Sequence, residues 1–200
     1  MRLRSTAARV ASVLILAAIA GPAWAHAGTG LAGGFASGFR HPLSGPDHLL
    51  AMVSVGLWGA FLGRPLVYLL PVIFPLVMVA GAAFGMIGLP MPPVELGIAL
   101  SVLVLGGCIA LAFRAPIWLA ALIVAVFAVF HGYAHGRELP SAADPAGYSL
   151  GFVLATGLLH VAGIGVGLVK DRPGGTAAIR VAGAAIGIAG IGFLVGAVAP

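Results

Sequence analysis

The sequence predicts an all-α membrane protein, a bundle of six transmembrane helices that follows a cleaved N-terminal signal peptide. Of its 200 residues, 61% are hydrophobic and only 8% are charged. A soluble domain carries about a quarter charged residues, so this chain cannot cover a water-facing surface. A soluble enzyme and a disordered tail are therefore excluded.

The charge and the cysteine count exclude further classes of protein. The formal net charge is +5, but the ten Lys and Arg residues are scattered, so there is no basic patch for phosphate contacts. We therefore expect no nucleic-acid partner. The single cysteine, Cys108, excludes a disulfide framework and a thiolate metal cluster.

The first 25 residues are typical of a secretory signal peptide. Arg2, Arg4 and Arg9 precede an apolar run, Val10–Ala20, which is followed by Ala23-Trp24-Ala25. A basic region, a short apolar region and an A-x-A site are the elements of such a signal. Since a membrane span needs about 20 apolar residues, a first transmembrane helix is less favoured. We expect cleavage after Ala25 and a single transmembrane domain over residues 26–200.

Six apolar stretches of membrane-spanning length follow, separated by polar or Pro/Gly breaks. Because the apolar residues are continuous and do not alternate with polar ones, helices are favoured over barrel strands. Pro71 and Pro75 are expected to kink the second helix. The stretches are Pro46–Leu62, Leu66–Leu89, Val94–Phe113, Pro116–His135, Tyr148–Val169 and Val181–Ala199.

The basic residues predict the orientation. Five of them fall in loops after the first, third and fifth helices, namely Arg64, Arg114, Lys170, Arg172 and Arg180. The opposite side holds only Arg40 and Arg137. The positive-inside rule puts the first set in the cytoplasm, so both mature termini lie outside it. This agrees with an exported residue 26.

Small residues four apart predict close helix packing. Three G-x-x-x-G pairs occur, Gly81/Gly85, Gly183/Gly187 and Gly192/Gly196. In lipid such pairs let helix backbones approach, either within one bundle or between copies in a homo-oligomer. The expected partners are thus lipid, a small metal ion and, in the case of a homo-oligomer, a second copy of the chain, and no nucleotide-binding motif is present.

The first polar motif precedes and opens the first helix. It contains His41, Asp47 and His48, with Met52 one turn further on. N-capping of the helix explains Ser44 and Asp47 alone, but it leaves both histidines unexplained. Two imidazoles and a carboxylate suit a divalent ion such as nickel, cobalt or zinc. Met52 is either a soft contact to that ion or a packing residue.

The second motif closes the fourth helix. His131, His135 and Glu138 follow at spacings of four and three, which place them on one helix face. Two histidines and an acid form half of a metal site. The predicted topology puts both motifs at the same membrane face, where they could converge. Glu138 could instead pair with its neighbour Arg137.

Two more ionisable residues lie in or near the predicted spans. Glu95 starts the third helix, where the helix dipole favours an acid, and a role in an ion pathway is the alternative. His160 lies halfway along the fifth helix. It either lines an inner part of a pathway or donates a hydrogen bond to a carbonyl of a neighbouring helix.

The two motifs, HPLSGPDHLLAM and FHGYAHGRE, together with VELGIALSVL around Glu95, resemble the HupE/UreJ family. The resemblance covers the mature chain. It implies a small bacterial inner-membrane protein that acts as a nickel permease for enzymes such as hydrogenase or urease, with some relatives linked to cobalt. It also implies that the metal-related positions are His41, Asp47, His48, His131, His135 and Glu138.

Three functions from different classes compete. The first is transport or facilitated diffusion of Ni²⁺, with Co²⁺ or Zn²⁺ as other substrates and no permanently bound cofactor. The second is an intramembrane zinc hydrolase that uses these histidines with Asp47 and Ser44. The third is a structural subunit of a larger complex, for which replacing the histidines would have no metal-dependent effect.

Cleavage after Ala25 would also create a metal-binding terminus. His26 would carry a free α-amine beside its imidazole, and both nitrogens of one residue can chelate a divalent ion. The Gly-rich segment from Gly28 to Gly38 is expected to be flexible and to pass ions from His26 to His41 and His48. The alternative is an exposed terminus with no role.

Overall fold

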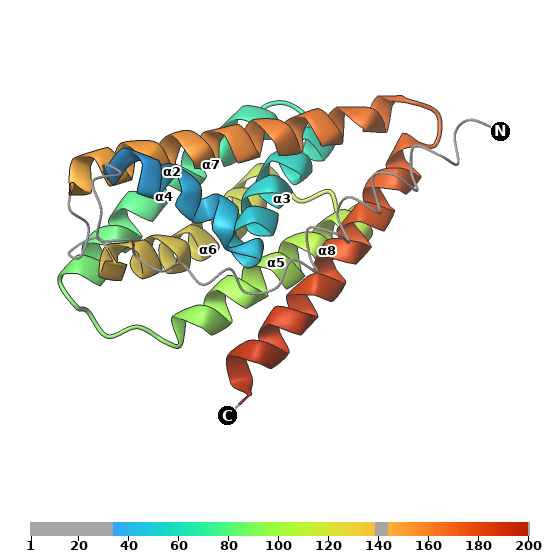
Figure 1. The fold of residues 1–200 in the computed structure, drawn as a ribbon. Helices are drawn as coiled ribbons and strands as arrows, with labels where there is room; N and C mark the ends of the chain where they lie inside the picture. Colours follow the sequence, from blue (N-terminus) through green and yellow to red (C-terminus); the bar gives the residue numbers. More distant parts are fainter. Residues whose placement is uncertain (1–33, 139–143, 200) are drawn as a thin grey trace.

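The computed structural model describes residues 34–138 and 144–199. Within these two ranges every regular element is helical (Figure 1), which confirms the predicted all-α class. The predicted signal peptide and His26 lie outside the described residues, so cleavage after Ala25 and a chelating terminus stay predictions.

Seven α-helices and one short 3-10 helix make up the described chain. Their connections are short, as the Pro/Gly breaks predict. The elements are α2 (Gly34–Ser44), α3 (Pro46–Leu62), α4 (Leu66–Met86), α5 (Val94–Ala110), α6 (Ile117–Glu138), α7 (Pro145–Gly167), η2 (Leu168–Asp171) and α8 (Gly175–Val198).

Four of the six predicted spans have the length and the apolar character of a membrane helix. These are α4, α6, α8 and the continuous segment of α7 and η2. The other two, α3 and α5, are apolar but have 17 residues each, about 25 Å at 1.5 Å per residue. Six crossings therefore stay a prediction.

The last helix begins six residues earlier than the apolar pattern predicts. The connection ends at Gly174, whose φ of 74° is left-handed, and α8 starts at Gly175. Arg180 therefore lies on the helix, and its predicted place in a loop is wrong. The charged Arg180 interrupts the apolar run, so the predicted stretch starts only at Val181, although the alanines before it favour a helix.

Residues 34–44 form an additional helix, α2, so the flexibility expected up to Gly38 is wrong for this part of the segment. Gly34 and Gly38 lie directly against the backbone of α7, at the carbonyls of Asp144 and Tyr148. A side chain at either position would prevent that approach. Packing on α7 thus offsets the low helix propensity of these glycines.

The helices pack in close groups. α4 packs on α6, α5 packs on α8, and both α2 and α3 pack on α7 (Figure 1). Gly56 of α3 lies against the carbonyl of His160 on α7, so these two helices are in backbone contact. The two helices α2 and α3 therefore pack one after the other along α7, with a break at Gly45.

Two of the three glycine pairs are used within this bundle. Gly81 and Gly85 of α4 meet carbonyls of α6, and Gly183 of α8 meets α5. Around Gly192 and Gly196, no neighbouring atom of the described residues lies within 4 Å of where a side chain would begin. Packing within one bundle accounts for the first two pairs, and a homo-oligomer stays a prediction.

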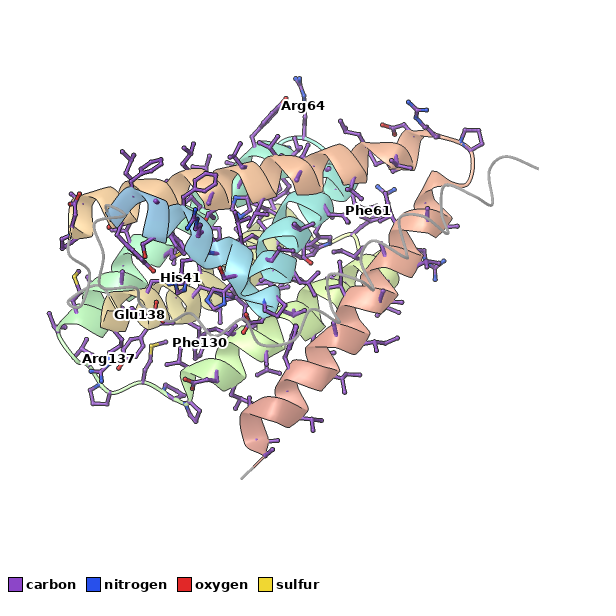
Figure 2. All side chains as sticks on the ribbon, viewed as in Figure 1. His41, Phe61, Arg64, Phe130, Arg137 and Glu138 are labelled. Carbon is purple, nitrogen blue, oxygen red and sulfur yellow. The ribbon has the colours of Figure 1, made fainter. Side chains whose placement is uncertain are left out.

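The basic residues of the predicted cytoplasmic side gather at one end of the bundle. Lys170 donates to the carbonyls of Ala60 and Phe61 at the end of α3. Arg180 Nε donates to Ala110 O over 2.8 Å at the end of α5, and the Arg114 guanidinium lies 5.4 Å from the ring centre of Phe61. Figure 2 shows Phe61 at the far end from Arg137 and Glu138.

We expect Lys170→Met to lower the free energy of unfolding by about 0.3–1 kcal/mol, the value of a cation at a helix C-terminus. The variant keeps the apolar stem but loses the donor to the last carbonyls of α3. Thermal unfolding in detergent measures the change. Arg172→Met, in the same exposed turn, is the control and should unfold like the parent; equal losses in the two variants would contradict the capping role.

Candidate metal-binding site

The break between α2 and α3 places two histidines near each other. α2 ends at Ser44, Gly45 is the N-cap of α3, and Pro46 occupies the first turn. His41 thus lies in the last turn of one helix and His48 in the first turn of the next, with ring centres 6.1 Å apart.

The predicted N-cap role of Ser44 is wrong. Ser44 is the last residue of α2, and its hydroxyl donates to Arg40 O over 2.9 Å. A residue at the end of one helix cannot also have the extended backbone that an N-cap requires, and Gly45 (φ −90°, ψ 110°) takes that position. The pattern did not reveal that a helix precedes Ser44.

The end of α6 completes the site from the other side. His41 Nε2 lies 3.4 Å from Glu138 Oε2, and His135 Nδ1 lies 3.6 Å from the same oxygen. One ligand atom from each of these three residues lies within 4.8 Å of the other two. Glu138 therefore faces the two histidines, and Figure 2 shows it beside His41. We call these three residues the outer triad.

Asp47 orients His48. Its Oδ1 accepts a hydrogen bond from the backbone N–H of His48 over 2.7 Å and lies 2.9 Å from His48 Nδ1. A carboxylate accepts only, so Nδ1 is the donor, and the tautomer with this single proton has its lone pair on Nε2. His48 Nε2 is buried without a partner in the described residues, and its lone pair is left for a ligand. A carboxylate behind a histidine is the usual support of a metal ligand.

Ser101 of α5 does the same for His131. Its hydroxyl donates to Ile98 O over 2.6 Å, and it also lies 3.0 Å from His131 Nε2. Because the hydroxyl has one proton, it can only accept from the imidazole. Nε2 of His131 is therefore protonated, and the lone pair is on Nδ1, which is buried without a partner among the described residues.

The four rings form one continuous cluster. His135 lies 4.8 Å from His41 and 5.0 Å from His48, and His48 lies 4.7 Å from His131, measured between ring centres. We call the pair His48 and His131 the inner pair. The cluster therefore brings the two sequence motifs together.

The cluster leads from the surface into the core. The exposed fraction of the side chain is 51% for Glu138, 26% for His41 and 12% for His48, and His131 is fully buried. Burial lowers the pKa of His41, and the nearby Glu138 carboxylate opposes that change. A neutral His41 keeps a lone pair for a cation.

The remaining predicted residues lie outside the cluster. Met52 is fully buried in the hydrophobic core with Leu57 and Phe74, as the packing alternative predicts. Glu95 is exposed in the first turn of α5, and no hydrogen bond or ion pair connects it to the cluster within the described ranges. His160 is buried deeper in the bundle and hydrogen-bonds the backbone of Pro71.

Several residues around the cluster were not predicted from the sequence. Phe152 lies 4.1 Å from the ring centre of His135, Tyr148 lies 6.0 Å from His41, and Phe74 lies 5.5 Å from His131. Nothing distinguishes these aromatics from core residues in an apolar sequence. Ser101 did carry a signal, because a hydroxyl within the VELGIALSVL segment is an isolated polar group.

Comparisons with known proteins agree with this architecture. The chain matches the family described as HupE / UreJ protein over residues 14–193. It is 45% identical over 182 residues to Protein HupE of Rhizobium leguminosarum bv. viciae, which covers 90% of this chain and 95% of the relative. No solved structure matches. With its membrane-length helices the chain is a multi-pass membrane protein, and it belongs to the HupE/UreJ family.

Proposed function

We propose that this protein carries a divalent transition-metal ion, Ni²⁺ in the first place, across the bacterial inner membrane. The observation that supports this most is the cluster itself: four imidazoles and two carboxylates that begin at the surface and end at a fully buried histidine. Nitrogen and oxygen ligands of this kind suit nickel, cobalt and zinc. Membership of the HupE/UreJ family favours nickel among them.

The arrangement also suits passage of an ion. A conducting site must bind strongly enough to remove water from the ion and weakly enough to release it. The outer triad offers one acid and two imidazoles, and the inner pair offers two ring nitrogens on separate helices. An ion would therefore exchange ligands step by step, passing from His135 of the outer triad to His48 of the inner pair.

The charge distribution supports an inward direction. Lys170, Arg180 and Arg114 gather at the end of the bundle opposite to the cluster, and the positive-inside rule assigns that end to the cytoplasm. The cluster then opens to the periplasm, and the protein takes up the ion. His26, at the start of the mature chain, would supply a first collection point there.

The alternative as a zinc hydrolase finds less support. The hydroxyl that this hypothesis uses, Ser44, is exposed on α2 and bonded to Arg40 O. Asp47 is engaged with His48 and is needed there to hold the imidazole. Transport requires neither a nucleophile nor a free general base.

The decisive experiment is metal flux into proteoliposomes that contain the purified protein. We expect Ni²⁺ to enter faster than in protein-free vesicles, with Co²⁺, Zn²⁺ and Cu²⁺ as competitors at equal concentration. If none of the four ions enters faster than in protein-free vesicles, the proposal is contradicted. Preference for Co²⁺ or Zn²⁺ would retain metal transport and change the substrate.

We expect Ser101→Ala to weaken Ni²⁺ binding by about 10–100-fold, the usual effect of losing the support of a metal ligand. Without the hydroxyl, the tautomer and the ring angle of His131 are no longer fixed. Equilibrium dialysis of the purified protein measures this. Ser54→Ala is the matched control, since Ser54 is equally buried but its hydroxyl has no partner in the described chain. Equal affinity in both variants would remove Ser101 from the site.

A further inference from the structure

A line of rings continues from the cluster into the middle of the bundle. Phe74 of α4 lies 5.5 Å from His131 and 5.6 Å from His160 of α7, measured between ring centres. All three side chains are fully or almost fully buried. Phe74 is therefore in ring contact both with the innermost histidine of the cluster and with His160, further along α7.

His160 has the features of a ligand. Its ring hydrogen-bonds the backbone of Pro71, and its Nε2 is buried without a partner in the described residues. A ring nitrogen bonded to a carbonyl must carry the proton, so the lone pair is on Nε2. Ligating histidines are commonly held in this way by a carbonyl. One turn earlier on α7, the hydroxyl of Thr156 is also buried and unpartnered.

The segment that carries Phe74 has a weakened backbone. Pro71 and Pro75 lie inside α4, on either side of Phe74, and neither has an N–H for the helical ladder. The carbonyl of Pro71 lacks a donor because residue 75 is proline, and His160 supplies one. In membrane helices such proline positions are where a helix bends, with neighbouring side chains satisfying the freed carbonyls.

We propose that Phe74 is an apolar gate between the inner pair and a second, deeper station for the metal ion at His160 and Thr156. This rests on the proposed transport function. An apolar constriction stops a hydrated cation by excluding its water. The ion would therefore pass from His131 to His160 Nε2 only when bending of α4 between its two prolines moves the Phe74 ring aside.

The gate can be tested without any metal. In a Cys108→Ala background, His160→Cys provides a single thiol, which a charged thiosulfonate reagent modifies if water reaches it. We expect modification at least 10-fold faster when Phe74→Ala is added, and also faster, by a smaller factor, with Phe74→Leu, which preserves most of the packing. Phe84→Ala is the matched control, because Phe84 lies exposed on the same helix and should leave the rate unchanged.

Fast modification with Phe74 in place, or no increase in either Phe74 variant, would overturn the gate. The deeper station is tested separately with His160→Ala: we expect Ni²⁺ flux to fall at least 10-fold while equilibrium Ni²⁺ binding by the cluster persists. Normal flux in this variant would overturn the station. If the unmodified protein neither binds nor transports Ni²⁺, the proposed function fails, whereas the thiol assay still decides whether Phe74 closes the path.

Discussion

His131→Ala and His48→Ala are each expected to abolish Ni²⁺ flux while the protein still inserts and folds. Each removes one of the two lone pairs of the inner pair, His131 Nδ1 or His48 Nε2, and leaves the ion a single nitrogen on the remaining helix. An ion that leaves the outer triad would then find only one of the two nitrogen ligands of the inner pair. Flux into proteoliposomes, with size-exclusion chromatography to check folding, measures the effect.

A second replacement distinguishes lost ligands from lost packing. His131→Gln retains polar atoms in the buried position and fills more of the space than alanine, yet an amide is a poor ligand for nickel. We expect this variant to be folded and equally inactive. Wild-type flux in His131→Gln would remove His131 from the pathway, and wild-type flux in His48→Ala would do the same for His48.

Most of the helical architecture was predictable from the sequence, since continuous apolar stretches and Pro/Gly breaks set where helices form. The helix α2 was not predictable, because glycines such as Gly34 and Gly38 are typical of loops and only their contact with α7 explains a helix here. The early start of α8 was missed for a different reason, since the charged Arg180 interrupts the apolar run. Tertiary packing decided the case of α2.

The residue types of the candidate site were predictable, but their individual environments were not. Histidines at i and i+4 identify one face of a helix, and the topology predicts that the two motifs meet at one end. Which side chain supports which ligand depends on contacts between helices. The bond between Ser101 and His131 joins residues 30 positions apart, and the place of Phe74 between His131 and His160 joins three helices.

Of all the replacements, that of Glu138 has the expected effect that differs most between the sequence and the structure. As a neighbour of Arg137 in a loop it would contribute little, and we would expect a small effect from the sequence alone. In the structure its Oε2 lies 3.4 Å from His41 Nε2 and 3.6 Å from His135 Nδ1, and it is the only carboxylate of the outer triad. A divalent ion held there without it would have two neutral imidazoles and no opposing charge.

We therefore expect Glu138→Gln to lower uptake at limiting Ni²⁺ by at least 10-fold, with a much smaller loss at saturating Ni²⁺, because the outer triad captures the ion and the inner pair is intact. Concentration-dependent flux into proteoliposomes gives both values. Arg137→Gln is the control: if Glu138 acts only through its neighbour, the two variants should lose the same amount of uptake. A normal response to Ni²⁺ concentration in Glu138→Gln would show that capture begins elsewhere, and would leave His41 and His135 as the candidate ligands at the surface end of the cluster.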